Sequence, residues 1–575
     1  MRRSTGSAIA AAALLALTTA ARAATAEAVA AQARPATCAD MTTAALGLAG
    51  VEITGATLAE HEASLPPHCI VRGRADPRVG TDGRQYAIGF EMRLPLAWNG
   101  RFLHQVNGGD DGEVVPAVGD PHEMNAYGGQ SALARGFAVI SSDEGHDAKD
   151  PANAGMGLTA GTEFGLDPQA RNDYGFAGDA RVGPIGKAII ARFYGVGPAT
   201  SYMMGCSNGG RHAMVAATRY ADRYDGFIAG DAGFNLPRAA IQHAWDVQNF
   251  RSVDPDIRKS FSPADMALIA RKVLEKCDAL DGLADGIVND IQACQKVFHL
   301  ADLQCSGAKT NQCLSAAQVA ALTRDFGGPH NSIGEQLYSD WPFDAGVAGH
   351  NWRFWKLESG IPPWHGNPLI ATMGAASLAW IFSTPPVQIK GDPDSLLNFL
   401  TRFDFDRDAP TIHATGSIML DGEPVEYRDS SWTFMTPPDV DNPKLAALHA
   451  AGHKLIVYHG QSDPVFSFNA TARWYEKLAV NNGGDATGFV RLFAVPGMTH
   501  CSGGPATDRF DALGAMVGWM EHARAPDRLI ATVSPGNKEV PSDWSPTRAR
   551  PLCVWPKVAR YIGGDIESAG SFDCR

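Results

Sequence analysis

Short apolar runs alternate with helical patterns in the first part of the chain and again near its end. Alternating or continuous apolar residues predict strands at 85–95, 102–106, 137–140, 201–204, 227–230, 455–459 and 490–495. Helical spacing of apolar residues predicts helices over 182–194, 211–220 and 510–522. Strands that are apolar throughout and alternate with helices are typical of a mostly parallel sheet covered on both faces. The pattern therefore predicts an α/β fold with a doubly wound sheet.

This rhythm is interrupted between residues 237 and 443, which are rich in Trp, Pro, Asp and Gly and show no regular alternation of strand and helix. We expect an inserted lid domain there, between a first core part at 24–236 and a second at 444–575. Residues 38–69 are expected to form an N-terminal cap with short strands. The tryptophans of the insertion could form its own core or line an aromatic pocket, and the sequence leaves this open.

The strand at 201–204 leads directly into Gly205-Cys-Ser-Asn-Gly209, and a helix follows. A G-x-S-x-G sequence between a strand and a helix is the nucleophile elbow of serine hydrolases, in which a sharp turn exposes the serine hydroxyl. The helix start behind it directs N–H groups toward a forming oxyanion. We interpret Ser207 as a nucleophile. The alternative is a glycine-rich turn with an incidental serine.

A serine hydroxyl needs a base within hydrogen-bond reach, and the base needs an orienting acid. Asp463 follows the strand at 455–459, and His500 follows the strand at 490–495. Their order along the chain, nucleophile, acid and histidine, is that of α/β-hydrolases. Asp463 could instead cap a helix before Pro464, and His500 could be a structural histidine. His459 and His146 are weaker candidates for the base.

A glycine pair, Gly108 and Gly109, follows the strand at 102–106. Enzymes with this elbow place a second oxyanion donor, a backbone N–H, in the loop after an early strand. Glycine allows a backbone to approach a substrate closely. We assign this donor to Gly109, while the alternative is an ordinary loop.

Charge and the N-terminus limit the partners and the location of the protein. The 575 residues carry a formal net charge of −13, so we expect no nucleic-acid partner. Residues 1–23 are expected to be an export signal. It begins with the positive charges of Arg2 and Arg3, continues with an Ala/Leu-rich run and ends with a cleavage site at Ala21-Arg-Ala23. No other apolar run approaches the length of a membrane span. We therefore expect a secreted or periplasmic protein without a membrane anchor.

Ten cysteines in an exported chain indicate disulfides. Eight fall into local pairs, which are Cys38–Cys69, Cys277–Cys294, Cys305–Cys313 and Cys553–Cys574. Cys206 and Cys501 remain, and each is adjacent to a proposed catalytic residue. A disulfide holds its two Cα atoms about 5–6 Å apart, so a bond between them would bring Ser207 and His500 together.

Residues 277–290 contain three aspartates at intervals of three and four, with glycine after two of them. Carboxylate and backbone oxygens are the preferred ligands of Ca²⁺, although the spacing is not that of an EF-hand. We expect calcium bound by the side chains of Asp278, Asp281 and Asp285 and by the carbonyls of Leu283 and Ile287. An acidic solvated turn is the alternative.

Four motifs together resemble the tannase and feruloyl esterase family of α/β-hydrolases, which includes mono(hydroxyethyl) terephthalate hydrolases. They are Gly-Cys-Ser-Asn-Gly-Gly at 205–210, Gly-Gln-Ser-Asp-Pro at 460–464, Gly-Met-Thr-His-Cys at 497–501 and Cys-Asp-Ala-Leu-Asp-Gly-Leu-Ala-Asp-Gly at 277–286. The resemblance covers nearly the whole mature chain. It implies a secreted carboxylic ester hydrolase that acts on small esters of aromatic acids and needs no organic cofactor.

The resemblance also implies particular roles. Calcium would be structural and lie in the lid domain, and Cys206 would be bonded to Cys501. The N–H groups of Asn208 and Gly109 (or Gly108) would bind the oxyanion. A terephthalate monoester has a free carboxylate that needs a cation, yet residues 357–390 offer no arginine, and the nearest candidates are Arg353 and Lys356.

Two other functions remain open at this stage. A prolyl-oligopeptidase-like peptidase would share the fold and the chain order, but no propeller segment or acidic amine-binding pair is evident. A calcium-stabilised binding protein with an inactive site would be non-catalytic. The sequence does not choose among gallate, ferulate and terephthalate esters.

Overall fold

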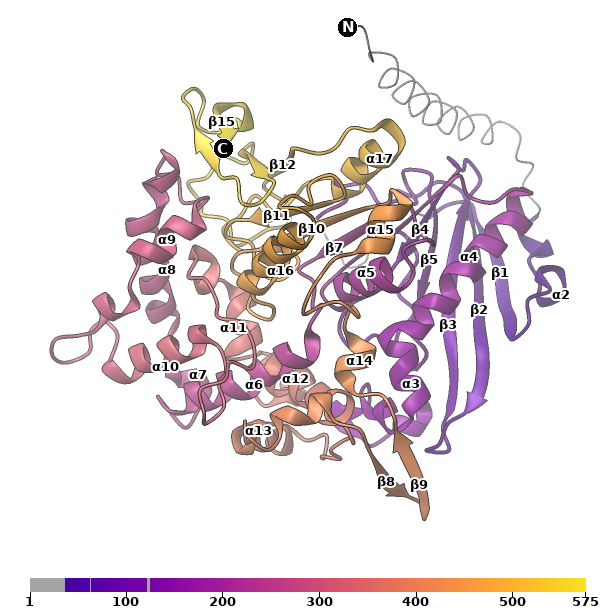
Figure 1. The fold of residues 1–575 in the computed structure, drawn as a ribbon, viewed down its shortest axis with the longest axis horizontal. Helices are drawn as coiled ribbons and strands as arrows, with labels where there is room; N and C mark the ends of the chain where they lie inside the picture. The colour runs from indigo at the N-terminus through magenta and orange to yellow at the C-terminus, as the bar shows by residue number, and fades with distance from the viewer. Residues whose placement is uncertain (1–36, 63, 121–124) are drawn as a thin grey trace, which may run out of the picture.

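The computed structural model describes residues 37–62, 64–120 and 125–575, so the expected export signal at 1–23 lies outside the described residues (Figure 1). Its centre is a nine-stranded sheet with the order β1-β2-β3-β5-β4-β6-β7-β10-β11. The strands are β1 Val51–Ala59, β2 His68–Val79, β3 Gln85–Pro95, β4 Arg101–Gln105, β5 Ala138–Ser142, β6 Thr200–Cys206, β7 Gly226–Gly230, β10 Lys454–Gly460 and β11 Val490–Val495.

The strands from β5 to β11 in this order pair in parallel, and β1, β2, β3 and β5 pair antiparallel. The mostly parallel α/β sheet expected from the sequence is therefore confirmed. The N-terminal cap with short strands is not found, because β1 and β2 are long strands that extend the central sheet. Each strand predicted by the apolar pattern is present.

Helices cover both faces of the sheet. On one face, α4 (Gly178–Tyr194), α5 (Asn208–Arg219) and α16 (Phe468–Asn481) pack against strand residues such as Met203. On the other face, α17 (Ala512–His522) packs against Tyr202 and Met204. Successive residues of β6 point to opposite faces, so both faces need an apolar cover. This explains the continuous apolar runs in the sequence.

Residues 237–443 contribute no strand to the central sheet. They form most of α6 and the elements that follow it, which Figure 1 shows gathered to the left of and below the sheet. These elements are α6 Leu236–Arg251, α7 Ile257–Ser260, α8 Pro263–Cys277, α9 Ile291–Val297, α10 Ala316–Gly327, α11 His350–Lys356, α12 Met373–Ser377, α13 Pro393–Arg402, α14 Ser431–Met435 and the hairpin of β8 Gly416–Leu420 and β9 Glu423–Tyr427. Trp341, Trp352, Trp355 and Trp380 are buried. Most tryptophans of the segment therefore belong to packed interior.

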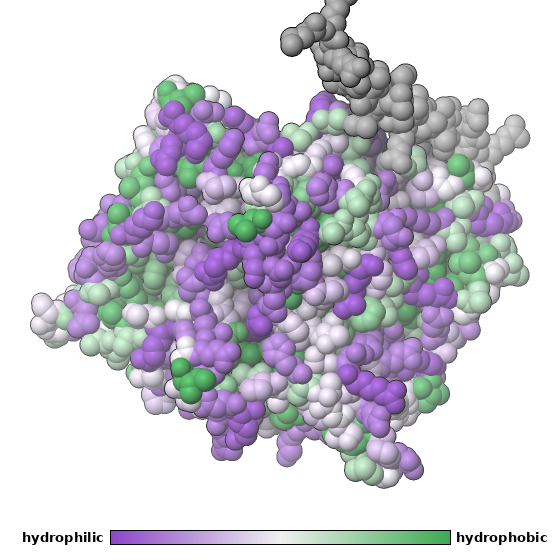
Figure 2. All heavy atoms as spheres, in the orientation of Figure 1, coloured by the Kyte–Doolittle hydropathy of each residue, from purple (hydrophilic) through white to green (hydrophobic). Residues whose placement is uncertain are grey.

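The remaining α-helices and strands belong neither to the central sheet nor to residues 237–443. They are α2 Thr43–Leu46, α3 Pro168–Asn172, α15 Ala446–Ala451 and two C-terminal pairs, β12 Arg528–Thr532 with β13 Ala549–Cys553 and β14 Ala559–Tyr561 with β15 Phe572–Cys574. Hydrophilic residues predominate on the face drawn in Figure 2, and hydrophobic ones form small scattered groups. Among the described residues, no helix is long and apolar enough to cross a membrane.

Candidate active site

Ser207 lies in a sharp turn between β6 and α5. Its backbone has φ 65° and ψ −127°, a conformation that is unfavourable for a residue with a side chain. The Ser207 N–H donates to the carbonyl of Gly230 in β7 at 2.9 Å. A Cβ atom on Gly209 would lie 2.4 Å from the carbonyl oxygen of Val106, and one on Gly210 would lie 2.3 Å from that of Gly230. The glycines of the motif therefore let the turn pack directly against neighbouring backbone.

Ser207, His500 and Asp463 form a continuous hydrogen-bonded chain. His500 Nε2 lies 2.8 Å from Ser207 Oγ, and His500 Nδ1 lies 2.8 Å from Asp463 Oδ2. An ionised carboxylate can only accept, so Nδ1 carries the imidazole hydrogen and Nε2 can accept the serine proton. The three residues that the sequence suggested, from three separate loops, are brought together.

The carboxylate of Asp463 is fully buried and accepts several hydrogen bonds. Oδ1 accepts the backbone N–H groups of Val465 at 2.7 Å and Phe466 at 3.1 Å, so the residue also caps the turn that follows it. Burial raises the pKa of Asp463, but His500 and His459 more than offset this effect and hold that pKa well below its usual value. Asp463 is therefore an anion that orients His500.

The two weaker candidates for the base occupy other positions. His459 lies behind Asp463, with Nε2 3.4 Å from Asp463 Oδ2. His146 is buried against the ring of Phe164, with ring centroids 3.8 Å apart, and burial lowers its pKa to about 3. Only His500 of these three is hydrogen-bonded to Ser207 Oγ.

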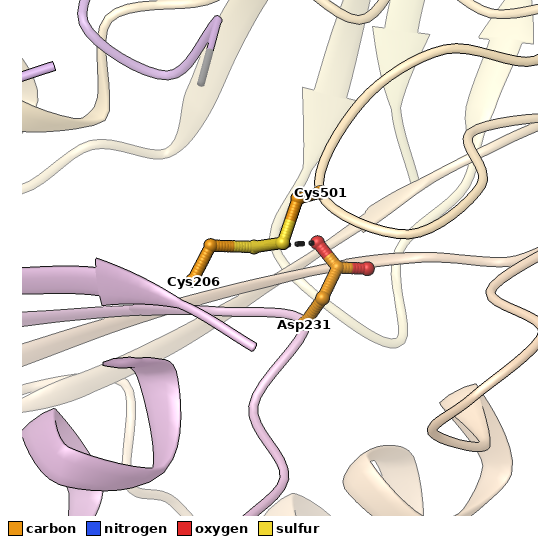
Figure 3. A group of neighbouring side chains, drawn as sticks. All are labelled: Cys206, Asp231 and Cys501. Atoms are coloured by element: carbon orange, nitrogen blue, oxygen red, sulfur yellow. Dashed lines mark hydrogen bonds between the residues drawn. A yellow bond between two sulfur atoms is a disulfide. The ribbon is translucent and has the colours of Figure 1, made fainter. Parts of the chain in front are cut away.

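The Cys206–Cys501 disulfide links the turn that carries Ser207 to the loop that carries His500. It joins residues 295 positions apart, and its Cα atoms are 6.0 Å apart. The other four pairs are also bonded as expected, which are Cys38–Cys69, Cys277–Cys294, Cys305–Cys313 and Cys553–Cys574. Figure 3 shows a neighbour that the sequence did not suggest, the carboxyl group of Asp231, directed at the disulfide.

Backbone N–H groups near Ser207 could stabilise an oxyanion. Asn208 is the first residue of α5, where N–H groups lack partners within the helix. Its side chain is tied away from the site, because Nδ2 donates to Asp111 at 2.8 Å and Oδ1 accepts from Arg211 at 2.6 Å. The loop after β4 also approaches the nucleophile, because a Cβ atom on Gly108 would lie 3.6 Å from Ser207 Cβ. Gly109 follows with φ 68°, which favours glycine.

Two aromatic side chains flank the imidazole of His500. The ring of Trp355, from α11, lies 5.2 Å from it edge-on, and the ring of Phe466 lies 5.4 Å from it. Sequence reasoning did not single out either residue as part of the site. The only signals were that Trp355 belongs to the tryptophan-rich insertion and that Phe466 follows Asp463 by three positions.

The two cations that the sequence offered for a free carboxylate have other partners. Lys356 Nζ lies 2.6 Å from Asp246 Oδ2, and both side chains are almost fully buried. Arg353 pairs with Glu358 at 2.5 Å and donates to the carbonyl of Phe261 at 2.8 Å. Neither group is therefore available to a substrate carboxylate in this arrangement.

The acidic loop at 278–290 is compact and polar. Asp278 accepts the N–H groups of Asp285 and Gly286 at 2.9 and 2.8 Å, and Asp281 accepts that of Leu283 at 3.0 Å. Burial, together with the neighbouring carboxylates, raises the pKa of Asp281 to about 6 and raises that of Asp278. In the described part of the chain, neither of these two forms an ion pair, whereas Asp285 pairs with Arg550. Asp278 and Asp281, which lack an ion-pair partner among the described residues, fit the donor set of a hard metal ion, whereas Arg550 already neutralises Asp285.

A family model described as "Tannase and feruloyl esterase" matches residues 69–575. The chain is 41% identical to mono(2-hydroxyethyl) terephthalate hydrolase of Piscinibacter sakaiensis over 543 residues, which covers 89% of this chain and 85% of the relative. It is 30% identical to an uncharacterized esterase of Xanthomonas campestris pv. campestris, with 94% and 91% covered.

Solved structures show the same fold at lower identity. Feruloyl esterase B from Aspergillus oryzae matches with a TM-score of 0.68 at 20% identity, covering 94% of this chain and 99% of that one. Tannin acyl hydrolase from Aspergillus niger matches with a TM-score of 0.61 at 20% identity, covering 96% and 94%. The fold expected from the sequence is thus found in two structures of known esterases.

Proposed function

Because the chain belongs to the tannase and feruloyl esterase family and is a carboxylic ester hydrolase, we propose that it cleaves esters of aromatic acids through an acyl-enzyme on Ser207. The observation that carries this proposal is the unbroken chain from Ser207 Oγ through His500 to the ionised Asp463. Such a chain is what activates a hydroxyl nucleophile at neutral pH.

The reaction would proceed in two balanced halves. Ser207 Oγ attacks the ester carbonyl carbon while its proton passes to His500 Nε2, and the carbonyl oxygen becomes an oxyanion. Collapse of this intermediate breaks the bond to the alcohol oxygen, and the alcohol leaves with the proton from His500. Water then donates a proton to His500 and attacks the acyl group. The acid is released, and Ser207 regains its proton.

The N–H groups of Asn208 and Gly109 are proposed as the oxyanion donors. The fixed side chain of Asn208 and the close approach of the Gly108–Gly109 loop to Ser207 support this assignment. Donors held in place before the reaction stabilise a forming charge without reorganisation. Residues 237–443 are proposed as a lid, because Trp355 of this segment lies against His500.

The flanking aromatic rings, and the engagement of Arg353 and Lys356 by carboxylates, favour an uncharged aromatic acyl group. Trp355 and Phe466 offer apolar ring surfaces beside His500, which suit stacking or edge contacts with an aromatic acid. Lys356 and Arg353 are engaged with Asp246 and Glu358. The relative from Piscinibacter sakaiensis is named for a terephthalate monoester, but we propose that feruloyl- or galloyl-type esters are better substrates here.

We also propose a structural calcium ion and export of the protein from the cytoplasm. Asp278, Asp281 and Asp285 would bind Ca²⁺ by their carboxylates, and Leu283 and Ile287 by their carbonyl oxygens. The ion would stabilise the fold and take no part in the chemistry. The five disulfides support folding in an oxidising compartment, so we propose a secreted or periplasmic enzyme.

A hydrolysis panel with Ser207→Ala as the matched variant tests the function. Methyl ferulate, methyl gallate, a terephthalate monoester and an aminoacyl amide are compared at equal concentration. We expect the two methyl esters to be cleaved fastest and Ser207→Ala to lose at least about 10³-fold in kcat while circular dichroism stays unchanged. Near-normal activity of Ser207→Ala would refute the nucleophile. Preferential cleavage of the amide would indicate a peptidase instead.

A further inference from the structure

Asp231 is a fully buried carboxyl group directly behind the catalytic residues. It follows β7, and Figure 3 shows its carboxyl group directed at the Cys206–Cys501 disulfide. Oδ2 lies 3.6 Å from Cys206 Sγ, and Oδ1 accepts the backbone N–H of Gly460 at 2.8 Å. A disulfide sulfur carries no hydrogen and cannot stabilise a carboxylate as a donor. The backbone N–H groups of Gly460 and Cys501 lower the pKa of Asp231, so a negative charge there would have only main-chain donors to offset its burial.

A second carboxyl group, that of the triad residue Asp463, lies beside it. One oxygen of Asp231, one oxygen of Asp463 and one nitrogen of His459 all lie within 4.8 Å of one another. All three side chains are 0% exposed. Two carboxylates at this separation in a dry interior repel each other, so the pair holds a proton. Burial, and then the charge of Asp463, raise the pKa of Asp231 well above its usual value.

The hydrogen bonds of His459 can be made without the proton that the two carboxyl groups hold. Its Nε2 lies 3.1 Å from the carbonyl oxygen of Phe466, which only accepts, so Nε2 carries hydrogen. Its Nδ1 lies 2.8 Å from Thr471 Oγ1, whose hydroxyl can donate to it. The neutral imidazole thus satisfies both of its contacts. Tyr458, another ionisable neighbour, has its pKa raised well above the usual value by burial and then by Asp231, so it stays neutral.

We propose that Asp231 is a neutral carboxylic acid that donates a hydrogen bond to the ionised Asp463 and so positions the triad. This inference rests on the proposed function of Ser207, His500 and Asp463. With Asp231 neutral, His500 faces one negative charge instead of two. A second buried charge would favour protonated imidazole, which cannot accept the serine proton. A hydrogen bond from Asp231 would also restrain the Asp463 carboxylate that orients His500.

Infrared difference spectroscopy tests the proton on Asp231 without requiring turnover. Wild type minus Asp231→Asn is expected to show the C=O stretch of a protonated carboxylic acid at neutral pH. Asp225→Asn is the matched control, because Asp225 lies at the other end of β7 and accepts the N–H of Ser201 at 2.8 Å. Its difference spectrum should lack that band. Absence of the band for Asp231→Asn would overturn the proposal even if the serine mechanism holds.

The pH profile of kcat/KM tests the electrostatic role. Neither a neutral acid nor an amide carries charge, so the acid-limb midpoint of Asp231→Asn should match that of wild type. If Asp231 were ionised, its removal would move the midpoint to lower pH by about one unit or more, and the proposal would be wrong.

The positioning role is tested with Asp231→Ala, which lacks any donor. We expect kcat to fall about 10-fold or more with little change in KM, provided that thermal unfolding shows a folded protein. Asp225→Ala serves as the control for loss of a half-buried carboxyl group that immediately precedes the same strand. A folded Asp231→Ala variant with normal kcat would exclude a positioning role.

Discussion

Ser207 keeps its unfavourable backbone conformation because the neighbouring glycines allow close main-chain packing. The added Cβ atoms would meet backbone carbonyl oxygens rather than flexible side chains, at 2.5 Å for Gly205 and 2.4 Å for Gly209. Backbone strain at a functional residue persists only where the surrounding structure fixes it. The glycines of the motif therefore allow the sharp turn, and they also let the surrounding backbone hold Ser207 in its strained conformation.

Gly209→Ala is expected to destabilise the protein and to displace the nucleophile. The new methyl group would lie within 2.6 Å of the carbonyl oxygens of Val106 and Asn107, so β4 or α5 must shift. We expect a loss of about 1–3 kcal/mol in the free energy of unfolding, measured by urea titration, together with lower kcat.

Gly197→Ala is the matched control for that substitution. Gly197 lies just before β6, and a Cβ atom there would meet nothing within 4 Å. Its stability should be unchanged or slightly increased, because alanine restricts the unfolded chain more than glycine does. Equal stability of the two variants would contradict the packing explanation.

Residues with a local signal could be found from the sequence, and residues defined by distant neighbours could not. Ser207 stands in a motif, and His500 and Asp463 follow strands in the right order. Asp231 also follows a strand, but only the pairing of β7 with β10 brings it beside Asp463. Trp355 belongs to the insertion but contacts His500 of the core, and no local sequence pattern reveals this contact.

At the scale of elements, the apolar pattern predicted the interior strands closely. β3 and β11 have the predicted bounds. The strands β1 and β2 were expected in a separate cap, since their place in the sheet depends on pairing with β3 and not on their own residues. The helix α16, between β10 and β11, was not predicted, although it covers the sheet beside Asp463.

Removing the Cys206–Cys501 disulfide is expected to reduce activity while secondary structure is retained. The bond joins the end of β6 to the loop after β11, and His500 and Ser207 must stay 2.8 Å apart across it. A loss of alignment of about 1 Å can cost about 10²-fold in rate. The double variant Cys206→Ala/Cys501→Ala should show such a fall in kcat, with an unchanged far-ultraviolet circular dichroism spectrum at room temperature.

The control is Cys305→Ala/Cys313→Ala, which removes a bond that closes a short loop of the insertion. It should leave kcat close to wild type. If the active-site double variant lost secondary structure together with activity, the bond would be structural for the whole core and not specific to the alignment of the two loops.

At the scale of the whole molecule, the acidic loop at 278–290 connects the insertion to the C-terminal strands. Arg550, in β13, pairs with Asp285, and Arg548 donates to the Asp285 carbonyl at 2.7 Å. Arg560, in β14, lies 2.6 Å from Asp290. Segments far apart in the sequence therefore meet at this loop. Its stability should affect the unfolding of the entire protein more than the chemistry at Ser207.

Chelation of calcium is accordingly expected to lower the unfolding temperature without changing kcat at temperatures where the protein stays folded. An ion at about 100 times its dissociation constant adds about 2.7 kcal/mol to the free energy of unfolding. Differential scanning fluorimetry with EDTA, and then with excess Ca²⁺, should show a reversible shift. Asp281→Asn should abolish the shift, because it removes one of two carboxylates without an ion-pair partner in the described chain.

Asp302→Asn is the matched substitution of an exposed aspartate in the same segment, and it should keep the full response to EDTA. Mg²⁺ should restore less stability than Ca²⁺, since it demands near-ideal octahedral geometry and gives up water reluctantly. If neither EDTA nor Ca²⁺ changed the unfolding temperature of the wild-type protein, the proposed calcium site would be wrong. The contacts of Asp285 and Asp290 with the arginines would then be sufficient to join the insertion to the C-terminal strands.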